Sequence, residues 1–299
     1  MIIRDRDRNQ IMVGVNPYKD WPKMYKKMLE YAGLWAADIG TYDGKMLPQM
    51  QYALNNIVLE KLICSKRDKL VAKFLLYNMP VCLLGVNDDT YLTTHSMPSG
   101  SFLTAMFNSL INRMYTAVWF FRYYNDTPSV AAYNNLVLDY VYGDDKINGI
   151  REVNGKTKDL HALSMRETFE SFGMSFTDSY KKDVKNKFSP LNEISFLKRT
   201  FTFHRQLNQI TCPLDVNTIY SSISFVDKNK NLLDVMSDKI NVFQREMFLH
   251  EDKYQNSVDK LELACVDKGL VFVRLCKDYL IKLYLSDLDQ YFSHLNVTL

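Results

Sequence analysis

The feature that most constrains this chain is a short acidic turn between two apolar runs. Residues 136–142 are mostly aliphatic, β-branched or aromatic, residues 143–145 read Gly-Asp-Asp, and Lys146-Ile147 resumes the strand-like pattern. Two such runs joined by a glycine-containing turn predict an antiparallel hairpin. The hairpin requires a sheet near the middle of the chain and sets Asp144 and Asp145 together at one of its ends.

Two neighbouring carboxylates raise each other's pKa, so such a pair is costly unless a cation neutralises it. A third carboxylate, Asp38, ends a predicted buried strand over residues 34–39, and Asp43 follows after four residues. If that strand lies beside the hairpin, Asp38, Asp144 and Asp145 converge on one point. Oxygen ligands of this kind suit hard divalent cations that bridge phosphates. For the turn taken alone, an ordinary Asp-rich hairpin is the alternative interpretation.

A helix predicted over residues 102–124 carries polar side chains on an otherwise apolar surface. Thr104 and Asn108 are four residues apart, so they share one face, and Ser99 lies in the preceding loop. Polar groups in this position need partners, and a sugar hydroxyl together with Asp43 would supply them. The alternative is a capped helix whose Thr and Asn side chains bond to the local backbone.

The remaining pattern indicates an α+β chain with a helical tail. Helices are predicted over 21–31, 47–64, 158–172, 231–249, 255–268 and 272–285, and a second hairpin over 194–203, bent at Lys198-Arg199. We therefore expect an α+β body to about residue 210, followed by helices. The length of 299 residues accommodates one large domain or two modest ones.

The composition excludes several classes of protein. Hydrophobic residues make up 47% and charged residues 24% of the chain, which argues against disorder. The formal net charge of +3 is nearly balanced, so a nucleic-acid partner has to be inferred from the site. The apolar runs are far shorter than a membrane span, and the five scattered cysteines predict buried free thiols in a reducing compartment. These features predict a soluble intracellular protein.

The order of the motifs resembles that of viral RNA-dependent RNA polymerases. Asp38-x4-Asp43 is similar to motif A, Ser99-Gly100-x3-Thr104-x3-Asn108 to motif B, and Tyr142-Gly143-Asp144-Asp145 to motif C. Residues 172–177 followed by Lys181 resemble motif D of the picornavirus-like group (Picornavirales), and residues 196–199, Phe-Leu-Lys-Arg, resemble its motif E. The resemblance covers about residues 11–225.

The resemblance implies a polymerase palm, which is an antiparallel sheet flanked by helices, with a helical C-terminal thumb portion. It places a lead-in from the fingers at residues 1–33, the palm at 34–210 and a partial thumb at 211–299. Residues 45–95 would partly pack with the fingers. The fingers domain that this family carries upstream has almost no counterpart here, so we expect a core fragment of a larger polymerase or polyprotein.

The resemblance also implies roles in template-directed nucleotidyl transfer by a two-metal mechanism. Asp38 and Asp144 would ligate two Mg²⁺ ions, with Mn²⁺ as a substitute, and Asp145 would support them. The ribose and triphosphate contacts would select ribonucleotides through the 2′-hydroxyl, and they would come from Asp43, Ser99, Gly100, Thr104 and Asn108.

Basic residues complete the implied site. Lys181 would protonate the leaving pyrophosphate, with Lys182 and Lys185 as rivals, and a solvated basic face is the alternative for all three. Lys198 and Arg199 would contact the primer backbone, with an exposed hairpin turn as the alternative.

The implied partners are template and nascent RNA, ribonucleoside triphosphates and the fingers segment, and the implied location is viral replication complexes in the host cytoplasm. A reverse transcriptase is one alternative. It is disfavoured because such enzymes usually carry a bulky aromatic at the position of Asp43 and lack the Ser-Gly-x3-Thr-x3-Asn helix. An inactive RNA-binding fragment of the polymerase is the other alternative.

Overall fold

The structure is a computed structural model that describes residues 6–95, 97, 103–225 and 231–286. The chain divides into two compact units. The sheet unit comprises residues 1–15 and 27–197, and the helical unit comprises residues 16–26 and 198–299. The division assigns residues 198–210 to the helical unit. The assignment of lead-in, palm and thumb to 1–33, 34–210 and 211–299 stays a prediction.

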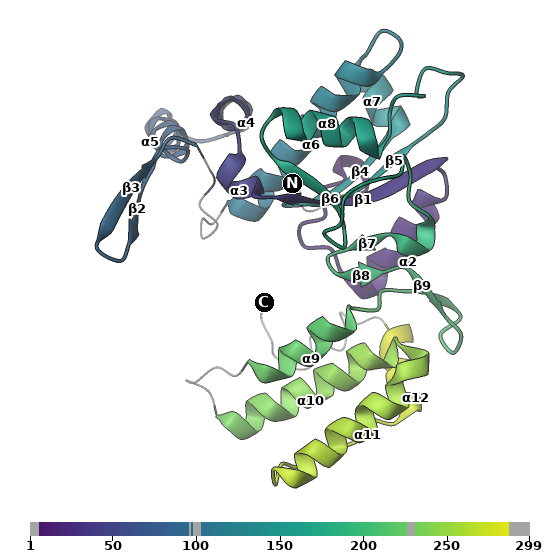
Figure 1. Cartoon of the computed structure of the whole chain (residues 1–299). Helices are drawn as coiled ribbons and strands as arrows, with labels where there is room; N and C mark the ends of the chain where they lie inside the picture. The colour runs from purple at the N-terminus through teal and green to yellow at the C-terminus, as the bar shows by residue number, and fades with distance from the viewer. Residues whose placement is uncertain (1–5, 96, 98–102, 226–230, 287–299) are drawn as a thin grey trace. The chain divides into compact units, whose positions relative to one another are not determined.

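The sheet unit is built on four antiparallel strands in the order β4-β5-β1-β6 (Figure 1). They are β1 (Gly33–Gly40), β4 (Val137–Tyr142), β5 (Asp145–Ile150) and β6 (Ser175–Asp178). The predicted strand over 34–39 and the predicted hairpin around 143–145 are therefore confirmed. Strand β1 lies between β5 and β6, with Ala37 opposite both Lys146 and Asp178.

Two helices cover one face of this sheet and form the core with it. Helix α6 (Thr104–Tyr123) packs on β4 and on α8 (Ala162–Ser171), and α8 also packs on β6. Their apolar sides meet the buried side chains of β1 in one cluster that includes Trp35, Tyr115 and Phe169. Between the helices, the Trp119 indole N–H donates to Ser164 Oγ over 2.9 Å. Burial of this continuous apolar surface holds α6 firmly against the hairpin.

Helix α8 begins at Ala162 and not at the predicted residue 158. The reason is a local cap: His161 Nδ1 accepts from the Ser164 N–H, and Ser164 Oγ accepts from the His161 N–H. This reciprocal pair satisfies N–H groups that the first helical turn leaves without partners. Gly173, with φ of 78°, ends the segment in the left-handed conformation that glycine tolerates.

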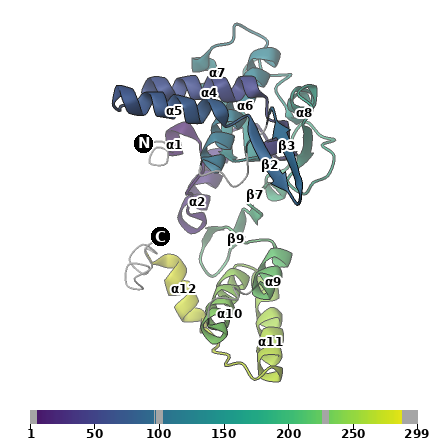
Figure 2. The same ribbon diagram turned by 90° about the vertical axis from the view of Figure 1, so that its left-hand side faces the viewer.

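Further elements of the sheet unit surround this core. They are α1 (Arg6–Asn9), α3 (Tyr42–Lys45), α4 (Pro48–Lys61), α5 (Lys66–Asn78), β2 (Cys82–Val86), β3 (Asp89–Thr93), α7 (Val130–Leu136), the 3₁₀ turn η2 (Leu191–Glu193) and β7 (Ser195–Phe196). Helix α4 confirms the prediction over 47–64 and packs on α5 and α6. Figure 2 shows α4 and α5 side by side. The sequence analysis did not predict α5, α7 or the β2–β3 hairpin.

The helical unit confirms most of the predicted tail. It contains β8 (Arg199–Thr200), β9 (Thr202–His204), β10 (Gln209–Thr211), α9 (Val216–Ser224), α10 (Leu232–Phe248), α11 (Glu251–Asp267) and α12 (Lys277–Leu285). Helix α10 packs against both α9 and α11. The helix predicted from residue 272 begins at Lys277, and the helix predicted over 21–31 is α2 (Pro17–Met28), which runs across the boundary between the two units.

Two sequence predictions about the surface have different outcomes. The prediction of buried thiols is right for Cys212 and Cys265, but Cys64 and Cys276 are exposed, and all four are free. Their burial depends on tertiary packing, which spacing along the chain does not reveal. Among the described residues, no helix is both long and apolar enough to cross a bilayer.

Candidate active site

The sheet brings the three predicted metal aspartates to the same end. Asp38 lies near the end of β1, Asp144 is at the exposed tip of the hairpin turn, and Asp145 begins β5 beside β1. Gly143 has φ of 67°, which a residue with a side chain rarely adopts, so the two-residue turn depends on glycine there. The hairpin and its neighbouring strand thus place three carboxylates where the sequence analysis expected them to converge.

The pKa values of Asp144 and Asp145 are raised by burial and by the charges of neighbouring carboxylates. Burial raises the pKa of Asp145 to about 7, the charges of Asp144 and Asp38 add to the rise, and the Leu197 N–H, 2.7 Å from Asp145 Oδ2, opposes it. Burial also raises the pKa of Asp144, and the charges of Asp38 and Asp43 add to that rise. Like charges held this close in partly desolvated surroundings are characteristic of functional sites.

The donor chemistry of this cluster fits a hard divalent cation. Its ligand atoms are carboxylate oxygens, and a bound cation would offset both the burial of these charges and the repulsion between them. Within the described ranges, no three acidic, His or Cys side chains are close enough together to hold a metal ion as they stand. The carboxylates therefore share one end of the sheet without forming a closed coordination shell.

Lys181 lies next to the acidic cluster. Its ammonium Nζ is 3.8 Å from Asp38 Oδ2, and its side chain is 79% exposed. The backbone of Lys181 has φ of 61° in the turn that follows β6. The two rival lysines, Lys182 and Lys185, are also exposed. The structure thus shows an exposed basic side chain beside Asp38.

The predicted ribose-contacting residues form a second polar group. Asn108 is buried on α6, and its Nδ2 donates to Asp43 Oδ1 over 2.5 Å. The Tyr42 hydroxyl donates to the Asn108 carbonyl oxygen over 2.9 Å and fixes α3 against α6. Asn108 Oδ1 is buried and has no hydrogen-bond partner among the described residues. A buried acceptor without a partner, next to a carboxylate, is suited to receive a hydroxyl donor.

The other members of this group are only partly visible. Thr104 is the first residue of α6 and is half-buried. Ser99 and Gly100 lie outside the described residues. The N-cap position of α6 is Leu103, which provides no side-chain hydrogen bond. The hydroxyl cap expected from residues before 102 also falls outside the described residues.

The two residues predicted to contact the primer differ in the structure. Lys198 is exposed in the turn between β7 and β8, with φ of 58°. Arg199 is only 13% exposed and binds Glu246 through two hydrogen bonds of 2.8 Å, one from each terminal nitrogen. It also donates to the Cys212 carbonyl oxygen. The Arg199 guanidinium is thus engaged within the helical unit, and its role as a phosphate contact stays a prediction.

The sequence analysis missed polar residues of α6 that support the hairpin turn. The Gly143 N–H donates to Ser109 Oγ over 2.8 Å, and Asn112 Nδ2 donates to the Gly143 carbonyl over 2.9 Å. Both residues follow Asn108 on a helix that is otherwise apolar. Polar residues at helical spacing could have indicated this contact, but the sequence alone did not show which segment they face.

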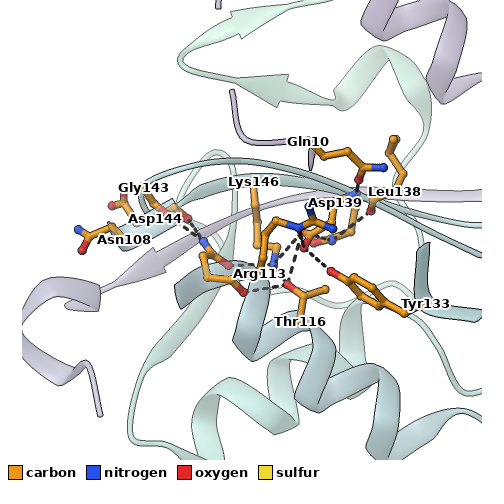
Figure 3. A network of polar contacts seen from close by, with 12 residues as sticks. Gln10, Asn108, Arg113, Thr116, Tyr133, Leu138, Asp139, Gly143, Asp144 and Lys146 are labelled. Carbon is orange, nitrogen blue, oxygen red and sulfur yellow. Dashed lines mark hydrogen bonds and ion pairs between the residues drawn. The ribbon is translucent and has the colours of Figure 1, made fainter. Parts of the chain in front are cut away.

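A buried ion pair lies beneath the same turn. Lys146 in β5 and Asp139 in β4 are both fully buried, and Nζ of Lys146 is 3.4 Å from Asp139 Oδ1. The other oxygen of Asp139 accepts from the Tyr133 hydroxyl over 2.7 Å and lies 3.6 Å from Nε of Arg113. Burial lowers the pKa of Lys146, and the charge of Asp139 opposes that change. The network is drawn in Figure 3.

Paired carboxylates on a hairpin, with another at the end of the adjacent strand, are the arrangement implied above for a polymerase palm. Residues 4–265 match the family model for viral RNA-dependent RNA polymerase. The chain therefore belongs to the viral RNA-dependent RNA polymerase family.

The curated relatives are viral polyproteins. The replicase polyprotein of cricket paralysis virus is 26% identical over 273 residues, which are 85% of this chain and 15% of that protein. The RNA1 polyprotein of tomato ringspot virus is 27% identical over 254 residues, 84% of this chain and 11% of that protein. The genome polyprotein of human hepatitis A virus is 24% identical over 274 residues, 89% of this chain and 12% of that protein. The chain thus spans between 11% and 15% of these relatives.

A solved structure shows the same fold. The Sicinivirus 3Dpol RNA dependent RNA polymerase matches with a TM-score of 0.75 and 17% identity, over 92% of this chain and 56% of that chain. The match confirms the predicted α+β polymerase fold. Together with the relatives, it confirms the resemblance to the picornavirus-like group.

Proposed function

We propose that this chain carries the catalytic core of a viral enzyme that transfers ribonucleotides to the 3′-hydroxyl of an RNA strand on an RNA template. The observation that carries the proposal is the convergence of Asp38, Asp144 and Asp145 at one end of the sheet, in a chain of this family. Two divalent cations, Mg²⁺ or Mn²⁺, supply the charge that activates the hydroxyl and holds the triphosphate when bound. Asp38 and Asp144 are the residues that hold them.

Asp145 has a supporting role in this proposal. The Leu197 N–H donates to Asp145 Oδ2 and so restrains the carboxylate. The negative charges of Asp145 and Asp38 interact with each other. A restrained carboxylate contributes negative potential at a defined position, and preorganised charge is effective in a partly desolvated site. Asp145 therefore orients and retains cations that Asp38 and Asp144 ligate.

Selection of ribonucleotides belongs to Asp43 and Asn108. Their contact places a carboxylate and the partnerless Asn108 Oδ1 together, and both can accept a hydrogen bond from a ribose hydroxyl. A deoxyribonucleotide would leave these acceptors without that donor, and an enzyme site that binds a substrate hydroxyl rejects the analogue that lacks it. Thr104, on the same face of α6, and residues Ser99 and Gly100 complete this part of the proposal.

Lys181 and Lys198 supply the positive groups. Lys181 is exposed and beside Asp38, so it is within the region where a triphosphate would be held, and it donates a proton to the departing pyrophosphate. Lys198 is exposed in its turn and contacts the primer phosphates. Template and nascent RNA, ribonucleoside triphosphates and the fingers segment of the same polyprotein are the partners, and host cytoplasmic replication complexes are the location.

The test is primer extension by a version of the chain lengthened at its N-terminus, on a primed RNA template with Mg²⁺. We expect elongation by the parent protein and none above background by Asp144→Ala. Asp126→Ala, which changes an exposed aspartate of the same unit, is the matched control and should remain active. Equal incorporation by Asp144→Ala would contradict the metal assignment. A parent protein that binds RNA without extending it would instead support the RNA-binding alternative.

A second measurement concerns the sugar. Asp43→Ala and Asn108→Ala should incorporate deoxyribonucleotides relative to ribonucleotides more readily than the parent protein does, because the acceptors for the 2′-hydroxyl are removed. The readout is the ratio of the two kcat/KM values on the same template. An unchanged ratio in both variants would contradict the role given to this pair.

A further inference from the structure

The starting point is the carboxamide of Asn112, which connects helix α6 to the acidic turn. Its Nδ2 donates to the Gly143 carbonyl oxygen over 2.9 Å and lies 3.5 Å from the Asp144 carbonyl oxygen. Ser109, one helical turn earlier, accepts the Gly143 N–H. Two side chains of α6 therefore hold the backbone N–H and carbonyl groups of the turn. The direction of the Asp144 side chain depends on that backbone.

The two orientations of this carboxamide, which differ by a 180° turn, are not equivalent. An amide group turned by 180° would present its oxygen to the Gly143 carbonyl, and two acceptors would then face each other. Lys146 prevents that arrangement because its Nζ, which can only donate, lies 3.0 Å from Asn112 Oδ1. The ammonium therefore selects the orientation in which Nδ2 faces the turn.

The ammonium is itself held in place. In addition to Asn112, it donates to Thr116 Oγ1 over 2.5 Å and lies 3.4 Å from Asp139 Oδ1. These three acceptors match the three protons of an ammonium group. Lys146 is fully buried, and its Nζ lies 5.4 Å from the centroid of the Phe169 ring. A buried donor with every proton engaged has one favourable position, so it can act as a fixed reference for Asn112.

We propose that Lys146 is a positioning residue that acts through Asn112 to hold the Gly143-Asp144 turn in the conformation that binds metal. The inference rests on the proposed function, since it deepens the role of Asp144. Lys146 touches neither substrate nor cation. It sets the amide orientation, the amide holds the turn carbonyls, and the turn directs the carboxylate. Residues that orient a ligand in this way commonly change metal affinity by about 10–100-fold when they are replaced.

The test compares Lys146→Met with Tyr133→Phe in the 299-residue chain. Methionine keeps the length and burial of the side chain but removes its donors. Tyr133→Phe is the matched control, because it also removes a buried hydrogen bond to Asp139 but leaves all three acceptors of the Lys146 ammonium in place. Isothermal titration with Mn²⁺ should show a Kd about tenfold higher for Lys146→Met and unchanged for Tyr133→Phe. An unchanged Kd for Lys146→Met, or an equal rise in both variants, would overturn the inference.

Amide hydrogen exchange at Gly143 provides a readout that needs neither metal nor turnover. Exchange should be faster in Lys146→Met and in Ser109→Ala, which removes the acceptor itself, and unchanged in Tyr133→Phe. A wild-type chain that binds no Mn²⁺ would count against the proposed function, whereas equal exchange rates in wild-type and Lys146→Met protein would count against the positioning role. The two failures are thus distinguishable.

A double-mutant cycle isolates the path through Asn112. If Lys146 acts through that residue, Lys146→Met should add little to the effect of Asn112→Leu on the Mn²⁺ Kd and on Gly143 exchange. Fully additive effects would show that Lys146 acts by another route and would overturn the inference. If Lys146→Met does not fold, Asn112→Leu alone, measured against Tyr133→Phe, decides between the same two results.

Discussion

One hairpin carries aspartates in two opposite electrostatic environments. Asp139, in the middle of β4, is fully buried and lies within 3.6 Å of both Lys146 and Arg113. Asp144 and Asp145, at the turn, have raised pKa values because burial disfavours their charged forms and the charges of neighbouring carboxylates add to the rise. The comparison separates two uses of the same side chain. Removing the partner of a compensated buried carboxylate is costly, whereas uncompensated carboxylates reduce the stability of the fold and are characteristic of functional sites.

The comparison also predicts the sign of the change in stability when a charge is removed. Removing charge from the compensated group should destabilise the fold, because buried cations lose their partner. Removing charge from the turn should not destabilise it. The variants below are ordered by the size of the expected change in the free energy of unfolding.

Asp139→Asn should have the largest effect. It leaves the buried Lys146 and the half-buried Arg113 without their carboxylate, and breaking such a pair typically costs about 3–5 kcal/mol. Urea unfolding followed by circular dichroism measures the loss. The matched control is Asp126→Asn, because its ion pair with Lys156 is exposed to solvent and should contribute far less to stability than the buried pair does. Equal losses in the two variants would break the comparison.

Arg199→Met extends the comparison to the helical unit. It removes both hydrogen bonds from Arg199 to Glu246. The Glu246 carboxylate is only 7% exposed, and the Tyr18 hydroxyl would still donate to it. We expect a loss of about 3 kcal/mol in the same unfolding measurement. Arg199→Lys should recover only part of it, because an ammonium cannot form the two parallel bonds. A loss of RNA affinity in a filter-binding assay, with unchanged stability, would instead support the predicted role of Arg199 as a phosphate contact.

Asp145→Asn should change stability in the opposite direction. The amide oxygen can still accept from the Leu197 N–H, while the charge next to Asp144 and Asp38 is removed. In metal-free buffer at pH 8 we expect unchanged stability or a gain of about 1 kcal/mol, which corresponds to less than one unit of pKa shift. Urea unfolding in the presence of EDTA measures it. A loss like that of Asp139→Asn would show that the turn is compensated after all.

The smallest effect should come from a polar contact outside both groups. His161 caps α8 through Nδ1, and burial, together with the charge of Lys187, lowers the pKa of His161 below 6.5. Because the folded state prefers the neutral ring, the contribution is complete above pH 6.5 and is lost as the pH falls through the lowered pKa. A cap contributes about 1 kcal/mol.

The melting temperature of the parent protein and of His161→Asn, measured between pH 7.5 and 5, tests this expectation. Asparagine also caps a helix but does not titrate in this range. The parent should therefore lose more stability on acidification than the variant does. Identical pH profiles would show that the cap does not depend on the charge of His161.

Local signals were sufficient for the elements around the candidate site. The hairpin at Gly143 and strand β1 follow from apolar runs and a glycine turn, and α6 follows from helical periodicity. The contact between Asp43 and Asn108 was predicted as well, because motif order indicated a shared site and helical spacing set the face of Asn108. Their roles in binding and catalysis stay predictions.

Long-range pairing explains what the sequence analysis missed. Lys146 interrupts an apolar strand and gave no sign that it is fully buried, because its partner Asp139 lies on the neighbouring strand. The sequence analysis did not predict the ion pair between Arg199 and Glu246, because Glu246 lies in a helix far along the chain. Helix α5 was missed because apolar side chains such as Leu70 and Phe74 lie on its exposed surface, so the sequence shows no clear apolar face at helical spacing.

The sequence by itself determined the local conformations and the identity of the reactive groups: a turn that needs glycine, two carboxylates beside it, and a helix with polar residues on one face. These depend on neighbouring residues only. The tertiary structure decided which charges are compensated, which lysine contacts Asn112 and that Asn108 Oδ1 has no hydrogen-bond partner among the residues described. Such properties depend on distance and on exclusion of water, and both arise only when segments far apart in the chain pack together.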